Sequence, residues 1–347
     1  MQILENVPLA PLTTLKVGGP ARYFAEATSA ADVRALADWA HSRQLPLFVL
    51  GGGSNLVIAD AGFPGLMLRI AISGIDQRSE NGRAIFEVGA GEEWDKLVER
   101  AVEANCAGIE CLSGIPGTVG GTPVQNVGAY GQEVSETITE VLALDLHDGQ
   151  LRNICNPGCG FAYRSSLFNT SERGRYIILR VTYALEPGGA AKIEYRDLKE
   201  YFKNSAHPSL SAVRKAVREI RLSKAMLIVE GDEDSRSAGS FFKNPVLDPA
   251  KYQELVRTAE TRGLTVPSYP APGQAFKIPA AWLVENAGLH KGYSNGRVGI
   301  SRKHALAIVN RGGATASEII ALKDEIQERV RDRFGVLLMP EPVMVGF

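Results

Sequence analysis

The chain has 347 residues, enough for two or three domains, because a single hydrophobic core seldom extends beyond about 250–300 residues. Hydrophobic residues make up 45% of it and charged residues 22%, which is typical of a globular protein and excludes disordered and fibrous classes. The net charge of −1 provides no bulk attraction to a nucleic acid polymer, although a local cationic pocket can still hold a nucleotide.

The chain shows no signal for export or for membrane insertion. No stretch approaches the roughly 18 apolar residues that a membrane-spanning helix needs. The first residues, MQILENVPLAPL, lack the basic start and apolar run of a signal peptide. We therefore expect a cytoplasmic protein with no membrane partner.

The four cysteines, at positions 106, 111, 155 and 159, form two loose pairs. Their C-x4-C and C-x3-C spacings differ from the C-x2-C knuckle of common zinc sites, and disulfides are unexpected without an export signal. We therefore predict buried or idle thiols and no metal site.

The first hundred residues predict helices alternating with strands. Short apolar runs predict strands at 45–50, 56–60, 65–70 and 84–88. Each of two segments has the apolar stripe of a helix with one buried face. The stripe residues are Val33, Leu36, Ala37 and Ala40 in the first helix, and Trp94, Leu97, Val98, Ala101 and Val102 in the second.

The remaining chain predicts strands at 139–146 and 176–185, and the second of these alternates like a half-buried antiparallel strand. A polar, Pro- and Gly-punctuated stretch and a helix with Leu210, Val213, Val217 and Ile220 on one face follow, and we expect a domain boundary within 190–222. A last helix should begin at the capping box of Thr315 and Glu318, end at Gly335 and precede a terminal strand. Its inward residues are Ile319, Ile326, Val330 and Phe334.

Two glycine-rich segments are candidates for ligand binding. GGGSN at 51–55 lacks the Gly-Lys-Ser/Thr of a P-loop, and it precedes a predicted strand rather than the helix of a Rossmann fingerprint. Its run of backbone N–H groups can still form an anion-holding nest, although a plain tight turn is an equally good interpretation. The second segment, 112–133, is long and apolar for a linker. Two such loops can clasp a long ligand with phosphates at one end and an aromatic ring at the other, the shape of a flavin dinucleotide.

Seven collinear stretches spanning nearly the whole chain carry a family resemblance. They are VGGPARYF (17–24), VLGGGSNLVIAD (49–60), SGIPGTVGGTPVQNVGAYGQE (113–133), YRSSLF (163–168), GSFFKNP (239–245), AAWLVENAGLHKG (280–292) and PEPVMVG (340–346). In these stretches the chain resembles the UDP-N-acetylenolpyruvoylglucosamine reductases, in the subtype with a tyrosine-bearing substrate loop.

The resemblance implies an α+β fold. A two-subdomain FAD-binding fold of the vanillyl-alcohol-oxidase/PCMH type would be followed by a separate α+β substrate-binding domain. We expect the first FAD-binding subdomain at 1–70 and the second at 71–221, with the substrate loop near 190–205. The substrate-binding domain is expected at 222–340, and residues 341–347 should form a C-terminal strand that carries a catalytic glutamate.

The resemblance also implies the reaction. Hydride would pass from NADPH to FAD and on to the enolpyruvyl group of UDP-N-acetylglucosamine enolpyruvate, giving UDP-N-acetylmuramate for bacterial peptidoglycan, cell shape and cell division. No His or Cys interrupts GGGSN, so FAD should be bound non-covalently. We expect a monomer whose partners are these small molecules, with no nucleic acid polymer.

The family's site residues transfer to matching positions of this chain. Arg164 would stabilise charge on the substrate carboxylate, Glu341 would assist it, and Ser240 would donate a proton beside Phe241 and Phe242. The residues assigned to FAD are Gly51, Gly52, Gly53, Ser54 and Asn55 in the first loop, and Gly114, Ile115, Pro116, Gly117 and Gly121 in the second. The residues assigned to the substrate are Tyr130, Tyr195, Lys224, Asn244, Tyr269 and Lys277.

Some residues depart from the family pattern. The segment between Lys224 and Ser240 is longer and more acidic than is usual, and Val343 stands where a basic residue is common. His304 is expected in the core or behind the residues that contact substrate.

Two alternatives stay open: a flavin oxidase or dehydrogenase of the same fold acting on a small alcohol, and a non-enzymatic nucleotide-binding module. Neither has a reason to keep Arg164, Ser240 and Glu341 together.

Overall fold

The computed structural model describes residues 2–205 and 207–347 and divides into two compact units. Unit 1 contains the residues up to Pro8, Pro20–Gly53 and Phe63–Leu227, and unit 2 contains Leu9–Gly19, Ser54–Gly62 and Ile228–Phe347. Two N-terminal segments thus belong to the unit that holds the C-terminal third. The finer domain limits expected from the sequence stay a prediction.

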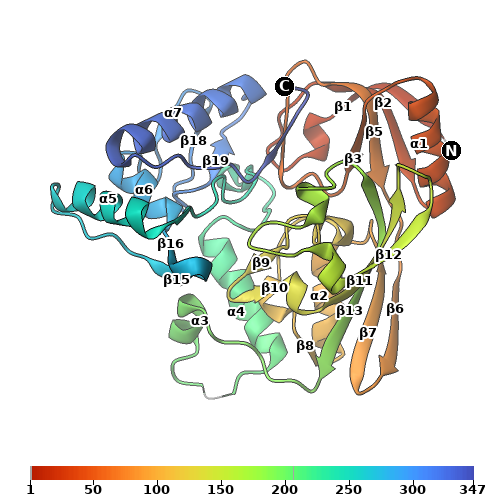
Figure 1. Cartoon of the computed structure of the whole chain (residues 1–347), viewed down its shortest axis with the longest axis horizontal. Helices are drawn as coiled ribbons and strands as arrows, with labels where there is room; N and C mark the ends of the chain where they lie inside the picture. Colours follow the sequence, from red (N-terminus) through yellow and green to blue (C-terminus); the bar gives the residue numbers. More distant parts are fainter. Residues whose placement is uncertain (1, 206) are drawn as a thin grey trace. The chain divides into compact units, whose positions relative to one another are not determined.

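One sheet of unit 1 has the strand order β1-β2-β5-β3 (Figure 1). Its strands are β1 (Ile3–Pro8), β2 (Pro20–Ala27), β5 (Phe63–Ile70) and β3 (Leu47–Leu50). Strands β2, β5 and β3 run parallel, whereas β1 is antiparallel to β2. Helix α1 (Ala30–Ser42) begins at Ser29, whose side chain accepts a hydrogen bond from the Asp32 N–H, and it packs against β2 and β5. The four stripe residues predicted for this helix are all buried, which confirms the prediction.

The larger sheet of unit 1 is antiparallel, with the order β12-β11-β13-β7-β6 and the short strand β8 beside β13. Its strands are β6 (Ile75–Glu80), β7 (Arg83–Gly89), β8 (Cys106–Ala107), β11 (Ile138–Asp145), β12 (Leu151–Cys155) and β13 (Tyr176–Pro187). The prediction that β13 is half-buried was wrong, since Ile177–Leu179 and Val181–Tyr183 are buried as consecutive runs. Successive strand residues point to opposite faces, so this central strand is covered on both sides. Helix α2 (Trp94–Glu103) buries all five predicted stripe residues.

The rest of unit 1 consists of a small hairpin and two helices. The hairpin pairs β9 (Gly128–Ala129) with β10 (Gln132–Glu133), and the helices are α3 (Arg196–Tyr201) and α4 (Leu210–Ser223). On α4 the predicted Leu210, Val213 and Val217 are buried and Ile220 is half-buried. The buried face also includes Arg221, which an apolar stripe does not predict.

Unit 2 contains three small sheets and three helices. One sheet has the order β14-β16-β15, a second has β17-β18-β19, and β20 pairs in parallel with β4. The strands are β4 (Leu56–Ile58), β14 (Val246–Leu247), β15 (Tyr269–Ala271), β16 (Ala275–Lys277), β17 (Ser294–Asn295), β18 (Val298–Ile300), β19 (Ile308–Asn310) and β20 (Val343–Val345). The helices are α5 (Pro249–Glu260), α6 (Ala280–Asn286) and α7 (Ala316–Phe334).

Helix α7 confirms the predicted capping box. The Thr315 side chain accepts from the Glu318 N–H, the Glu318 carboxylate accepts from the Thr315 N–H, and Gly335 ends the helix with φ of 69°. Its four predicted inward residues are buried. The first turn also donates the N–H groups of Ala316 and Ser317 to the carboxylate of Asp60, which lies two residues after the end of β4. This capping and the β4·β20 pairing explain why residues 54–62 belong to unit 2.

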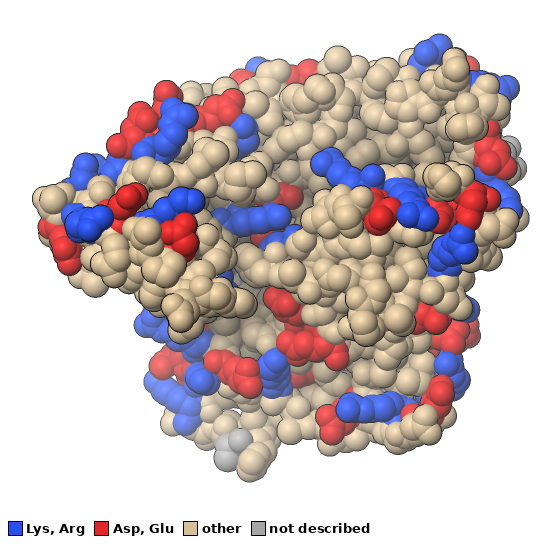
Figure 2. Space-filling model, viewed as in Figure 1, with Lys and Arg blue, Asp and Glu red and all other residues tan. Residues whose placement is uncertain are grey.

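Three cysteines are buried and Cys155 is exposed. Among the residues described, no helix combines the length and the apolar character needed to cross a membrane. Within 2–205 and 207–347, no group of three or more His, Cys, Asp and Glu side chains is placed to hold a metal ion. On the face seen in Figure 2, Lys and Arg are interspersed with Asp and Glu, in keeping with the net charge of −1.

Candidate active site

The two glycine-rich loops meet closely within unit 1. A β-carbon added to Gly52 would lie 2.5 Å from the α-carbon of Gly117, and one added to Gly51 would lie 2.8 Å from the Thr118 hydroxyl oxygen. Gly117 also has φ of 126°, a conformation that residues with a side chain rarely adopt. At Gly121, in contrast, no atom lies within 4 Å of such a carbon. The chain therefore brings two strips of bare backbone together and leaves open space beside one of them, a cradle that fits a dinucleotide.

Side chains of α2 and α4 hold the second loop at Gly114 by both its N–H and its carbonyl. The Gly114 N–H donates to the carboxylate of Asp95 at 2.6 Å, and the buried Arg221 donates through Nε to the Gly114 carbonyl at 3.2 Å. Asp95 in turn receives two hydrogen bonds from Arg214, at 2.6 and 3.1 Å, and one from Arg218. A bidentate arginine–carboxylate pair is rigid, so the loop is pinned to the helices behind it.

Burial and hydrogen bonding have opposite effects on the pKa of the Asp95 carboxyl in this clamp. Burial tends to raise the pKa of the Asp95 carboxyl, but hydrogen bonds from Arg214 and the Gly114 N–H outweigh it, so this pKa lies below its ordinary value. Burial lowers the pKa of the Arg221 guanidinium. Asp95 thus stays ionised where the clamp needs an acceptor.

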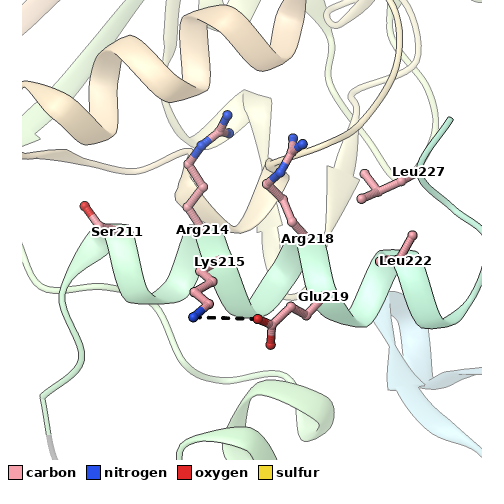
Figure 3. A pocket seen from close by; sticks show the side chains of 7 residues that line it. All are labelled: Ser211, Arg214, Lys215, Arg218, Glu219, Leu222 and Leu227. Carbon is pink, nitrogen blue, oxygen red and sulfur yellow. Dashed lines mark ion pairs between the residues drawn. The ribbon is translucent and has the colours of Figure 1, made fainter. Parts of the chain in front are cut away.

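A cavity of about 480 Å³ lies along α4 and shares the two arginines of the clamp. Figure 3 shows Arg214 and Arg218 extending from one side of the helix, while the ion-paired Lys215 and Glu219 lie at another. The wall is completed by Ser211, Leu222 and Leu227. None of these lining residues was predicted as a site residue.

Arg164 lies in a turn with a strained backbone. Its φ is 54°, in the left-handed region that costs a non-glycine residue free energy. Its Nη2 donates to the Gly128 carbonyl at 2.7 Å, so the guanidinium lies against the β9–β10 hairpin of the glycine-rich segment. The Asn169 side chain holds the Arg164 carbonyl at 3.3 Å. Backbone strain that the surroundings enforce is characteristic of functional positions.

The hairpin itself carries Tyr130 at its tip. Tyr130 and Gly131 both have positive φ, 49° and 86°, as a type I′ turn requires, although Asn is the usual first residue of such a turn. The Tyr130 ring packs edge-on against Tyr195 at 5.4 Å, and Lys224 Nζ lies 6.0 Å from the ring centre. Lys224 also forms an ion pair with Asp197. Three predicted substrate residues thus lie together in unit 1.

Ser240 lies in unit 2 beside a histidine. Its hydroxyl oxygen is 2.9 Å from His304 Nε2. Phe241 and Phe242 follow it and are almost fully buried, with relative exposures of 0% and 2%. The Phe241 N–H donates to the Leu306 carbonyl at 2.8 Å, which holds the Ser240 backbone against the segment that carries His304.

Backbone pairing brings Glu341 next to the Ser240 segment. The Glu341 N–H donates to the Phe241 carbonyl at 2.9 Å, and Phe242 forms a bridge with Pro340. On its other side, Glu341 accepts through its carbonyl from the Asn55 side chain at 3.2 Å. Hydrogen bonds therefore join the segment that follows Ser240, Glu341 and Asn55 of GGGSN.

The other predicted substrate residues of unit 2 lie on the β14-β16-β15 sheet or at its end. Lys277 is paired with Tyr269 on one side and with Val246 on the other, and Tyr269 is 57% exposed. Asn244 precedes β14, and its side-chain oxygen accepts from the Ala280 N–H at 2.8 Å. This bond caps the start of α6 and fixes the direction of the Asn244 side chain.

The predicted residues are thus divided between the two units. Gly51–Gly53, the second glycine loop, Arg164, Tyr130, Tyr195 and Lys224 belong to unit 1. Ser54, Asn55, Ser240, Glu341, Asn244, Tyr269 and Lys277 belong to unit 2. The boundary between the units falls inside GGGSN.

Sequence reasoning missed two supporting residues, Asp95 and Arg221, and it did not predict the contact of His304 with Ser240. A signal existed for the clamp, because Arg214, Arg218 and Arg221 recur at helical spacing on one face of α4. No sequence signal links Ser240 to His304, which are 64 residues apart.

Comparison with known families agrees with this arrangement. Residues 21–154 match the FAD binding domain model, and residues 232–345 match the model described as the C-terminal domain of UDP-N-acetylenolpyruvoylglucosamine reductase. The fold and these two matches define a two-domain flavoprotein of the α+β class.

Full-length relatives narrow this class. The chain is 45% identical to the UDP-N-acetylenolpyruvoylglucosamine reductase of Streptomyces avermitilis, over 100% of this chain and 96% of that relative. It is 43% identical to that of Mycobacterium tuberculosis, over 99% and 95%. A solved reductase structure of the same name, from Thermus caldophilus, superimposes with a TM-score of 0.67 at 27% identity and covers 99% of both chains.

The chain belongs to the UDP-N-acetylenolpyruvoylglucosamine reductase family. The resemblance to this family, read from the motifs, is therefore confirmed, whereas the subtype with a tyrosine-bearing substrate loop stays a prediction. The FAD-binding domain ahead of a separate C-terminal domain and the class of FAD-dependent oxidoreductase are confirmed as well.

Proposed function

We propose that this chain reduces the enolpyruvyl group of UDP-N-acetylglucosamine enolpyruvate to the lactyl group of UDP-N-acetylmuramate, using NADPH, as a cytoplasmic monomer. Similarity over the full length supports the reaction class. The observation that carries the proposal is the hydrogen bond from the Glu341 N–H to the carbonyl of Phe241, the residue after Ser240, since a plain alcohol oxidase has no use for Ser240 and Glu341 together.

The protein must bind the flavin and stabilise the negative charge that hydride addition creates on the substrate. The glycine loops would hold FAD, which when bound would supply two-electron transfer from NADPH to the substrate double bond. Hydride addition at the terminal methylene leaves negative charge on the α-carbon and the adjoining carboxylate. The Arg164 guanidinium offers parallel N–H donors to that carboxylate, and the Glu341 carboxyl group assists as charge accumulates.

Ser240 completes the reaction by giving its hydroxyl proton to the α-carbon. A serine hydroxyl is a weak acid in water, but a carbanion beside a carboxylate is a strong base, so position matters more than acidity. Buried Phe241 and Phe242 hold the serine backbone and keep water from that side.

Tyr130, Tyr195 and Lys224 bind the sugar nucleotide. Burial raises the pKa of Tyr130, so the phenol stays protonated near neutral pH and can donate a hydrogen bond. Lys224, paired with Asp197, exchanges this partner for the diphosphate. Tyr195, 46% exposed, closes over the bound ligand. Asn244, Tyr269 and Lys277 supply the remaining contacts.

The test uses the purified, FAD-loaded protein under nitrogen. NADPH should bleach the flavin absorbance, and UDP-N-acetylglucosamine enolpyruvate should restore it with formation of UDP-N-acetylmuramate. Failure of the sugar nucleotide to reoxidise the flavin would overturn the proposal. Recovery with oxygen but not with that substrate would favour the oxidase alternative, and a chain that binds no flavin would favour the binding module.

A further inference from the structure

The Ser240 hydroxyl forms a hydrogen bond with the imidazole ring of His304. Ser240 Oγ and His304 Nε2 are 2.9 Å apart. A hydroxyl has one hydrogen and two acceptor positions. If Ser240 donated that hydrogen to Nε2, it would have none directed at substrate, so a serine that protonates substrate needs Nε2 as the donor.

We propose that His304 is a positioning residue for the protonation step, and that the acidic loop Asp232–Ser235 holds the turn that presents it. The inference rests on the proposed role of Ser240. His304 Nε2–H donates to Ser240 Oγ, which leaves the serine hydrogen free to point at the substrate. The same bond then stabilises the oxygen from which that hydrogen departs.

Solvent water replaces the proton that Ser240 gives to the substrate. The Oγ–H bond of Ser240 breaks as a C–H bond forms at the α-carbon, which leaves an alkoxide on Oγ. The Nε2–H of His304 stabilises this alkoxide until water returns a proton to it, and hydroxide leaves to the solvent. His304 keeps its own proton throughout.

The turn that carries His304 is held from two sides. It is closed by backbone bonds, from the Ser301 N–H to the Ala307 carbonyl at 2.8 Å and from the Ala307 N–H to the His304 carbonyl at 3.2 Å. The Leu306 carbonyl also accepts from the Phe241 N–H at 2.8 Å, which sets the turn against the segment that follows Ser240.

The acidic loop grips the same turn. The buried Asp234 carboxylate accepts from the Arg302 N–H at 3.0 Å, and Asp232 forms an ion pair with Lys303 at 2.9 Å. The 3₁₀ helix Glu233–Ser235 fixes the positions of both aspartates relative to each other, because the Asp232 side chain accepts a hydrogen bond from the Asp234 N–H. Arg302 and Lys303 are the two residues that precede His304. The acidic loop Asp232–Ser235 therefore supports the residue that contacts Ser240.

The experiment compares the two half-reactions in His304→Ala and His304→Gln. Flavin reduction by NADPH should proceed normally in both. Reoxidation by the sugar nucleotide should slow by about 10²-fold in His304→Ala, as for loss of one charge-stabilising donor. His304→Gln should recover most of this rate, because the glutamine amide also donates. Adding His304→Ala to Ser240→Ala should cause no further loss.

The hydrogen bond between His304 and Ser240 can also be examined by NMR without any turnover. In the 15N-labelled protein the His304 resonance, assigned by its loss in His304→Gln among five histidines, should show a protonated Nε2 that shifts in Ser240→Ala. An unprotonated Nε2, or a His304→Ala variant with wild-type reoxidation, would overturn the inference. If the wild-type protein itself is not reoxidised by the substrate, the proposed function is wrong instead.

The loop is tested by Asp234→Ala, with the milder Asp232→Asn in case the first variant fails to fold. Both should slow reoxidation, on the order of 10-fold for Asp234→Ala, without changing flavin reduction. Glu230→Gln, an exposed carboxylate in the same segment, is the matched control and should match wild type. Equal rates for Asp232→Asn and Glu230→Gln would show that the loop does not support His304.

Discussion

The two units hold their candidate site residues by different means. In unit 1, side-chain charges do the holding: Asp95 and Arg221 clamp Gly114, and Arg164 grips Gly128 from a strained backbone. In unit 2, backbone hydrogen bonds from the Phe241 N–H to Leu306 and from the Glu341 N–H to Phe241 hold the Ser240 segment, and carboxylates act only farther out, on the turn that carries His304. Ion pairs respond to pH and salt, whereas backbone ladders respond little. The clamp at Gly114 should therefore respond to acid and salt more than the backbone pairing of Phe241 with Leu306 and Glu341.

The largest effect should come from the backbone-held unit. Ser240→Ala removes the proposed proton donor without touching the ladder that positions it. We expect turnover to fall by about 10³-fold, within the range of general acid catalysis, while flavin reduction by NADPH stays close to wild type. Stopped-flow absorbance of the two half-reactions measures both. Equal slowing of the two halves would contradict the assignment.

The clamp of unit 1 should be the more sensitive to pH. Asp95→Asn breaks a largely buried ion pair, since the side chains of Asp95 and Arg214 are 18% and 12% exposed, and should lower the free energy of unfolding by about 3 kcal/mol at pH 7. Because the pKa of folded Asp95 is depressed, its contribution is complete above the unfolded pKa of about 4 and is lost as pH falls below it.

The difference between wild type and Asp95→Asn should therefore shrink on acidification, which urea unfolding at several pH values measures. Glu99→Gln is the control, because Glu99 contacts the same Arg214 but is 57% exposed. It should cost no more than about 1 kcal/mol. A gap that is constant down to pH 3 would show that ionised Asp95 does not stabilise the clamp.

The glycine cradle can be probed at two positions that differ in available space. Gly52→Ala places a methyl group against the Gly117 backbone and should cost about 2 kcal/mol of stability even without flavin. Gly121→Ala meets open space and should leave apoprotein stability within about 0.5 kcal/mol. If Gly121 faces FAD, its variant should instead bind the flavin more weakly. Thermal melts with and without FAD separate the two outcomes.

The smallest expected effect concerns the strain at Arg164. With φ of 54°, Arg164→Gly should be more stable to unfolding than Arg164→Ala by about 1 kcal/mol, because glycine adopts this conformation at little cost. Both variants should lose turnover, since neither has a guanidinium. Chemical denaturation compares their stabilities. Equal stability would mean that the backbone relaxes on substitution and stores no strain.

Features that depend on residues close together in the sequence could be predicted, whereas features that depend on distant residues could not. The buried faces of α1, α2 and α7 were predicted because one-sided helices repeat apolar residues locally. The burial of both faces of β13 was not, because it depends on what covers the sheet. The membership of residues 54–62 in unit 2 was not predicted either, because it rests on contacts with β20 and α7, which are far away along the chain.

The candidate catalytic residues were predicted from their motifs, but the contacts that hold them and the glycine loop in place were not. Ser240, Glu341 and Arg164 stand in stretches specific to the family. His304 and Asp95 act through contacts with residues far along the chain, 64 and 119 residues away. The sequence placed His304 only in the core or behind the substrate contacts and offered arginines at helical spacing on α4, but the partner that each of these groups contacts became visible only in the structure.

The most direct test of the central claim, that hydride and proton reach the substrate from different sources, is the isotope content of the product. With unlabelled NADPH in D2O under nitrogen, we predict UDP-N-acetylmuramate with one deuterium at the α-carbon, delivered by exchanged Ser240, and transferred protium in the methyl group. Proton NMR of the lactyl group reads both positions. A product without deuterium at the α-carbon, or flavin reoxidation without any product, would contradict the account.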